Sequence, residues 1–386
     1  MKKCVVLLLL ICIVLLIPKG VVFADSSEEE KLQTEVDRTL SDLDMGSLEE
    51  ITQDSDNLEI MTSFEDIVKN LVSANYKEDN GVILNKIINK LFSQILSFVP
   101  IMLLILAIAI LGNIVDSFKP GESSKAISDL IHFVCVSAVV VILISVFKNV
   151  YTSTTNCVDG ISKQMEIIYP ILLTLLSSMG SVVSASIYQP VVGILTNGVC
   201  AIFKTILYPI FIISFLFVVL GNLTSKVKLN KFTSFLSSLF KWVVGFVFTM
   251  FAGFLTIKGI SAGRYDTISL KATRFAMKSY VPIIGGYLSD GLDYAMLGSA
   301  IIKNAVGVAG LLLMFSSVVV PIITIVVLKL CLQLVAGVLE PIGDSTLSKF
   351  CDDVSKILIF PIVIILSMAF MYLISVSLIM CTFVGV

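Results

Sequence analysis

One histidine among 386 residues is the first scarcity in this sequence. His132 has no second histidine with which to hold a metal, and a single histidine rules out most catalytic sites built on this side chain. The motifs H-E-x-x-H, G-x-S-x-G and G-x-x-x-x-G-K-[ST] are also missing, which removes the signatures of zinc proteases, serine hydrolases and P-loop nucleotide binding. The sequence therefore predicts no enzyme, no metal and no cofactor.

Charged residues are scarce as well. They make up 15% of the chain, against about a quarter in soluble domains, while hydrophobic residues make up 56%. So much apolar surface cannot be buried in a water-soluble core, and the chain is predicted to be an all-α, polytopic membrane protein. No block combines basic and aromatic residues in a way that predicts nucleic-acid binding. The eight cysteines include no C-x-x-C pair and are expected to be small buried hydrophobes.

What is present begins with an apolar leader, residues 1–24. Lys2 and Lys3 precede an apolar run from Val5 to Ile17, and residues 22–24 suit a signal-peptide cleavage site. This run is too short to cross about 30 Å of hydrocarbon as a helix. We therefore predict a cleaved signal peptide, with an uncleaved anchor as the alternative.

Residues 25–90 form an acidic region that the leader would place outside the cytoplasm. Of the 29 acidic residues, 15 lie between Asp25 and Asp66. Apolar residues at helical spacing predict two amphipathic helices, one with Leu32, Val36, Leu40 and Leu43 and the other with Phe64, Ile67, Val68, Leu71 and Val72. The region either docks on a partner or is a solvated acidic spacer. From Gly81 an interfacial helix leads into the first span.

Residues 91–386 are predicted to be a transmembrane domain of about seven spans. The candidates are 94–115, 127–147, 166–187, 199–221, 242–262, 305–328 and part of 357–384. The predicted loops 223–241 and 263–280 flank one span, yet both carry the excess of basic residues typical of cytoplasmic loops. Either one loop breaks this rule or 235–262 is a re-entrant hairpin, which Gly245 and its neighbouring glycines would permit.

Small residues recur every four positions in two places. They are Ser177, Ser181 and Ala185 in one segment and Gly291, Ala295 and Ser299 in another. This spacing lets helix backbones approach closely, so both segments are predicted to be packing seams.

The block 268–310 carries four basic residues, Lys271, Arg274, Lys278 and Lys303, around the two acids Asp290 and Asp293. Asp290 and Asp293 share one face of a helix, whereas Lys303 is rotated from Asp293 by about 80° and displaced by about 15 Å. Charges in membrane segments are costly unless they are paired or hydrated. The acidic pair is interpreted either as part of a proton or cation relay or as a face that meets a lumen, the membrane surface or a partner. The basic stretch 264–279 suits an anionic leaflet.

These residues carry a family resemblance. The stretch L-K-A-T-R-F-A-M-K-S-Y-V-P-I-I-G-G (270–286), followed by D-G-L-D-Y (290–294) and I-K-N-A-V-G-V-A-G (302–310), resembles the stage III sporulation protein AE family of endospore-forming bacteria. Residues 169–190 supply a second similar patch. The residues that match the family's motif are Lys271, Arg274, Pro282, Gly285, Asp290, Asp293, Lys303, Asn304, Gly307 and Gly310.

The resemblance implies a non-enzymatic component of a secretion-like channel complex that joins mother cell and forespore and supports forespore development after engulfment. It implies a place in the mother-cell membrane around the forespore, with the N-terminal region in the intermembrane space. The implied partners are membrane lipid, the other proteins of the same operon, including a separate ATPase, and a forespore-made protein. A homo-oligomer is also expected.

The family supplies no catalytic residue. Asp290, Asp293, Lys303 and Asn304 are instead candidates for a polar path or for a contact between protomers. A stand-alone secondary transporter is the alternative function, and a membrane chaperone or assembly factor is a third.

Overall fold

The computed structural model describes residues 64–72, 80–117, 124–223, 229–280, 285–342 and 345–382, and every regular element in these ranges is a helix. The elements are α4 (Phe64–Val72), α5 (Asn80–Ser117), α6 (Ser124–Ser178), α7 (Val182–Gly193), η1 (Ile194–Val199), α8 (Cys200–Ile202), η2 (Phe203–Leu207), α9 (Tyr208–Leu223), α10 (Asn230–Tyr280), α11 (Gly285–Ile342), α12 (Ser345–Ile357) and α13 (Ile359–Cys381). The short segments η1 and η2 are π-helical. The predicted all-α class is confirmed. The predicted signal peptide, the helix at 32–43 and Pro282 lie outside the described residues.

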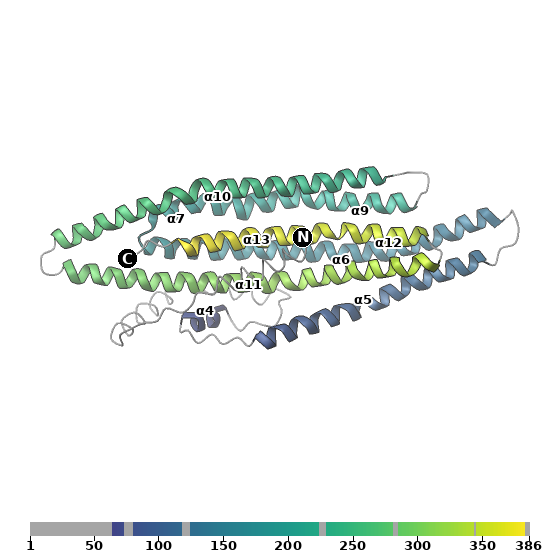
Figure 1. Cartoon of the computed structure of the whole chain (residues 1–386), viewed down its shortest axis with the longest axis horizontal. Coiled ribbons are helices and arrows are strands. Elements are labelled where there is room, and N and C mark those ends of the chain that lie inside the picture. Colours follow the sequence, from purple (N-terminus) through teal and green to yellow (C-terminus); the bar gives the residue numbers. More distant parts are fainter. Residues whose placement is uncertain are drawn as a thin grey trace.

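The helices run side by side in an elongated bundle, with α13 in its middle (Figure 1). α13 is apolar along its whole length and packs against α6 and α11. Tyr169 of α6 and Tyr372 of α13 meet edge to face at 5.8 Å, and the hydroxyl groups of Tyr169 and Ser375 share a hydrogen bond of 2.5 Å. A strongly apolar, uncharged helix therefore forms the centre of the core, as burial of hydrophobic surface favours.

α4 and α5 lie at the periphery of this bundle. α4 buries the predicted face of Phe64, Ile67 and Val68 and packs against α11. α5 begins at Asn80 and continues without a break into the first span, as the sequence predicts. α5 diverges from its neighbours over part of its length (Figure 1).

Six helical segments among the described residues are long and apolar enough to cross a membrane, where the sequence predicts about seven spans. They are Asn85–Ile114, Phe133–Ser178, Val182–Leu223, Lys231–Leu255, Gly291–Ile342 and Ser345–Cys381. The number differs because α6 runs through the polar stretch between the predicted spans 127–147 and 166–187. Val150, Val158 and Ile161 are buried in that stretch, so one side of α6 packs on the bundle while the other side is polar.

Gly180 ends α6 and divides the predicted span 166–187. Its φ of 79° lies in the left-handed region, which glycine adopts at little energetic cost. A Cβ atom at this position would also lie 2.4 Å from Cδ2 of Leu270, on α10. Ser177 therefore belongs to α6 and Ala185 to α7, so the four-residue spacing from Ser177 to Ala185 does not follow one helix.

α10 contradicts the alternative of a re-entrant hairpin at 235–262. It is one continuous helix of 51 residues, and the predicted loop 263–280 forms its last turns. Glycine in an exposed helix destabilises it by only about 1 kcal/mol relative to alanine, and a Cβ atom at Gly245 or Gly253 would meet nothing within 4 Å. The glycines are therefore tolerated within the helix and do not break it.

α11 contacts its neighbours closely at two glycines of the predicted signature block. A Cβ atom at Gly307 would lie 2.5 Å from Sδ of Met380, and one at Gly310 would lie 2.9 Å from both Cδ1 of Ile168 and the hydroxyl of Tyr372. These glycines let α13 and α6 approach the backbone of α11, which is how small residues serve helix packing in membranes.

The substitution Gly310→Val is expected to reduce the free energy of unfolding in detergent by about 1–3 kcal/mol, because the added methyl groups overpack a full core. Gly337→Val is the matched control, since a Cβ atom at Gly337, on the same helix, meets nothing within 4 Å. Thermal melting followed by circular dichroism would measure both. Equal melting temperatures for the two variants would contradict this account of the α11 seam.

Candidate functional site at one end of the bundle

Charged residues from α10 and α11 gather at the end of the bundle where α6 ends, α7 begins and α13 ends. This is the left end in Figure 1, where α10 and α11 extend past the other helices. We call the residues Asp266, Arg274, Asp293 and Lys303 the charged end cluster. Two of these four side chains, Asp266 and Lys303, are buried.

Lys303 binds the C-terminus of α13. Its side chain is 1% exposed, and Nζ donates hydrogen bonds to the carbonyl oxygens of Ile379 (3.2 Å), Met380 (3.1 Å) and Thr382 (2.8 Å). The last carbonyls of a helix have no partner within the helix, and a cation is favoured there by the helix dipole. The three donors of one ammonium group thus satisfy three acceptors. Lys303 caps α13 from a different helix.

Asp266 binds the opposite kind of helix end, the N-terminus of α7. Oδ1 accepts from the backbone N–H of Val183 (2.9 Å), and Oδ2 accepts from the backbone N–H of Ser184 (3.1 Å) and from its hydroxyl. The first N–H groups of a helix are the ones left without internal partners, and a carboxylate is their preferred ligand. Asp266 is fully buried, so this contact fixes α10 against α7.

Asp293 is paired within the chain. Its Oδ1 lies 2.6 Å from Nη2 of Arg274, and both side chains are about one quarter exposed. The structure therefore brings together two residues of the predicted signature block, Arg274 and Asp293, and it places Lys303 with α13 rather than with Asp293. Asp290 lies three residues before Asp293 on α11. Its role in a polar path, like that of Asp293 and Lys303, stays a prediction.

The other predicted site residues have smaller parts in this end of the bundle. Ser299 is buried and accepts a hydrogen bond of 2.9 Å from the hydroxyl of Ser178. Asn304 has a buried Oδ1 without a hydrogen-bond partner among the described residues. Gly291 and Lys271 are exposed, Ala295 is half-buried and Gly285 begins α11. Ser181 is buried with a hydroxyl that has no partner in the part of the chain described.

Sequence reasoning missed Asp266 as a functional candidate. The available signal was that Asp266 is the one acidic residue in the basic stretch 263–280. Its partners are 82 and 83 residues away in sequence, so no local pattern could identify them.

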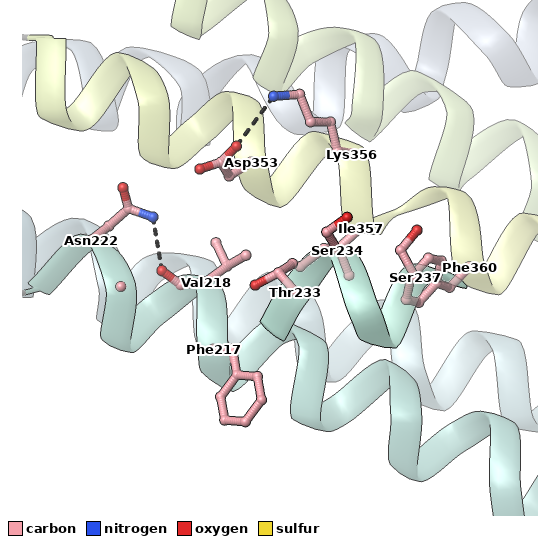
Figure 2. A pocket seen from close by; sticks show the side chains of 11 residues that line it. Phe217, Val218, Asn222, Thr233, Ser234, Ser237, Asp353, Lys356, Ile357 and Phe360 are labelled. Atoms are coloured by element: carbon pink, nitrogen blue, oxygen red, sulfur yellow. Dashed lines mark hydrogen bonds and ion pairs between the residues drawn. The ribbon is translucent and has the colours of Figure 1, made fainter. Parts of the chain in front are cut away.

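A polar cleft of about 230 Å³ lies toward the other end of the bundle, between α9–α10 and α12–α13 (Figure 2). Nδ2 of Asn222 donates to the carbonyl of Val218 (2.8 Å), and Nζ of Lys356 donates to Oδ1 of Asp353 (3.2 Å). Thr233, Ser234 and Ser237 add hydroxyl groups from α10. The two charged side chains of the cleft, Lys356 and Asp353, thus pair with each other. The remaining polar groups of the cleft do not indicate a particular class of ligand. Among the described residues, no cluster of three or more His, Cys, Asp or Glu side chains could hold a metal ion.

The helices and the charged end cluster define the class of this protein: a polytopic, all-α membrane protein whose helix ends are fixed by charges from neighbouring helices. Within that class, the chain matches the family of stage III sporulation protein AE over residues 62–382, and it belongs to that family. A curated relative, stage III sporulation protein AE of Bacillus subtilis (strain 168), is 23% identical over 279 residues, which cover 72% of this chain and 69% of the relative. No solved structure matches.

The substitution Asp266→Ala is expected to reduce the free energy of unfolding by about 2–4 kcal/mol, because it leaves three donors at the start of α7, two of them buried, without their acceptor. Asp266→Asn keeps one acceptor oxygen and should have an intermediate effect. Asp353→Ala, which removes a partly exposed carboxylate on α12, is the control and should change stability by about 0.5 kcal/mol or less. A wild-type melting temperature for Asp266→Ala would contradict the capping role.

Proposed function

We propose that this protein is a non-enzymatic, membrane-embedded subunit of a secretion-like channel complex that links mother cell and forespore and is needed for forespore development after engulfment. Membership of the stage III sporulation protein AE family carries this proposal. The proposed location is the mother-cell membrane that surrounds the forespore, with the N-terminal region in the intermembrane space. The proposed partners are the other proteins of the same operon, including a separate ATPase, and a protein made in the forespore.

Two features of the fold support a subunit role. Large apolar side chains are exposed on several outer helices, such as Leu103 on α5, Leu216 on α9 and Trp242 on α10, which suits contact with lipid. α6, α10 and α11 have 55, 51 and 58 residues, so each is roughly 75–90 Å long against about 30 Å of hydrocarbon. An upright bundle of this length extends far outside the lipid, where partner proteins can bind.

The charged end cluster also fits such a role. Its buried charges are used to hold helix ends together, which gives the end of the bundle a fixed shape. A preformed surface binds a partner with a smaller loss of conformational entropy than a mobile one. The absence of a P-loop motif from the sequence is consistent with energy supplied by another subunit.

Affinity capture from sporulating cells is expected to separate the proposed function from a stand-alone transporter. The tagged full-length protein, solubilised in mild detergent, should co-purify with the other products of its operon. The same protein alone in liposomes should take up no solute. Solute uptake by the purified protein, together with capture of none of the operon proteins, would support the transporter and contradict the channel subunit.

Neutralising the two aspartates of α11 tests the predicted polar path. The double variant Asp290→Asn, Asp293→Asn is expected to stop sporulation after engulfment while the protein level stays normal, because a charged path or contact loses both carboxylates. Asp353→Asn, outside the signature block, is the control and should sporulate normally. Lys303→Gln belongs in a separate strain, since it also removes the α13 cap. Normal spore yield in the double variant would count against any role of these charges.

A further inference from the structure

One face of α6 is polar along most of its second half. The residues on this face fall within an arc of about 80° on the helix, at 100° per residue. They are Ser145, Lys148, Thr152, Asn156, Asp159, Lys163, Glu166 and Thr174, and all are exposed or half-buried. We call this set the α6 polar stripe. Pro170 is the apolar residue within the same arc, and the face becomes apolar before the stripe, at Val134 and Val141.

This face differs from the outer faces of the neighbouring helices. No large apolar side chain of α6 between residues 145 and 178 is exposed, whereas α5 and α9 expose such side chains along their lengths, for instance Leu103 (60%) and Leu216 (49%). Lipid favours apolar faces, so α5 and α9 suit a lipid environment and this part of α6 does not.

An ion pair joins the stripe to a neighbouring segment. Nζ of Lys204, in the π-helical segment η2, lies 2.7 Å from Oδ1 of Asp159, and the two side chains are 50% and 38% exposed. π-helical turns occur frequently at functional sites. Lys163 and Glu166 follow Asp159 on the same face at four and seven residues, so charges of both signs are present.

The stripe lies at the level where its neighbours are most apolar. Nε2 of Gln164 donates to Oγ of Ser317 at 3.0 Å, and Sγ of Cys157 lies 3.6 Å from the carbonyl oxygen of Ser317. Ser317 is near the middle of the stretch 304–328 of α11, which carries no charge and is about 37 Å long. The Asp159–Lys204 pair thus lies close to the centre of a segment long enough to cross the hydrocarbon.

We propose that the α6 polar stripe, with Lys204, lines a water-filled path enclosed by several copies of this chain. Copies inserted into one membrane with the same orientation place each residue of the stripe at the same depth. Under the cyclic symmetry usual for oligomers, Lys163 would then face Lys163 and Glu166 would face Glu166. Like charges cannot be packed together in a dry seam, so water must separate them. The mixed signs along the stripe suit passage of polar solutes. This inference rests on the proposed channel function.

Thiol reactivity in native membranes tests the path. Asn156→Cys and Lys163→Cys in the full-length chain should react with a charged, membrane-impermeant methanethiosulfonate on the order of tenfold or more faster than Leu103→Cys and Leu216→Cys, because a thiolate forms only where water reaches it. The unsubstituted chain gives the background labelling of the native cysteines. One member of a series of bismaleimides of increasing length should also link Asn156→Cys to Asn156→Cys of a second copy across the water between them.

Each outcome decides the proposal. Fast labelling with self-linkage supports it. Slow labelling at both stripe positions overturns it, and fast labelling without self-linkage shows that another molecule, not a second copy, faces the stripe. Affinity capture from the same membranes separates this inference from the proposed function. If operon proteins co-purify but the stripe is unreactive, only the inference fails. If the stripe reacts and self-links while no operon protein is captured, only the channel-complex function fails.

Discussion

Helix ends that lie inside a membrane bundle must find partners within the protein, and this requirement governs the fold described here. Water does not reach a helix end that is buried in the bundle, so the free N–H groups at the start of such a helix and the free carbonyls at its end need partners in the protein. α7 begins and α13 ends against other helices, and each end receives a buried charge of the sign that its dipole favours. Asp266 and Lys303 thereby determine how α10 and α11 are positioned against the two helices that they cap.

The two kinds of charge in this protein have different surroundings. Those of the charged end cluster are satisfied by backbone groups or by each other within the chain. The charges of the α6 polar stripe face outward, and Lys204 is the one described ion-pair partner that the chain supplies to them. The charges of the charged end cluster therefore hold the structure together, whereas those of the α6 polar stripe are available to the surroundings of the protein.

Much of the fold could be predicted from the sequence. Hydropathy and helical spacing predict the all-α class, the buried face of α4 and the continuation of α5 into a span. The unbroken length of α6 and α10 could not be predicted in this way, because a polar stretch within a long amphipathic helix has the same composition as a loop. The end of α6 at Gly180 could not be predicted for a related reason. Glycine is tolerated within the helices of this protein, so a glycine in an apolar run does not indicate that its φ is positive.

The candidate site shows the same limit. Charge in an apolar segment draws attention to Asp293 and Lys303, whose role in a polar path stays a prediction. Their partners come from tertiary packing, since Lys303 contacts residues 76 to 79 positions away, and no spacing rule reaches that far. Asp266 was not predicted, because a single acid among basic residues is interpreted as a local counter-ion. In the structure its carboxylate binds the N-terminus of α7.

The contact between Leu270 and Gly180 also limits how the bundle can move. The side chain of Leu270 occupies the space that a Cβ atom at Gly180 would need, and it does so at the corner where α6 turns into α7. Translation of α10 along its own axis would force Leu270 against the backbone on either side of that corner. Sliding of α10 past this corner would therefore first require the leucine side chain to leave the space beside Gly180.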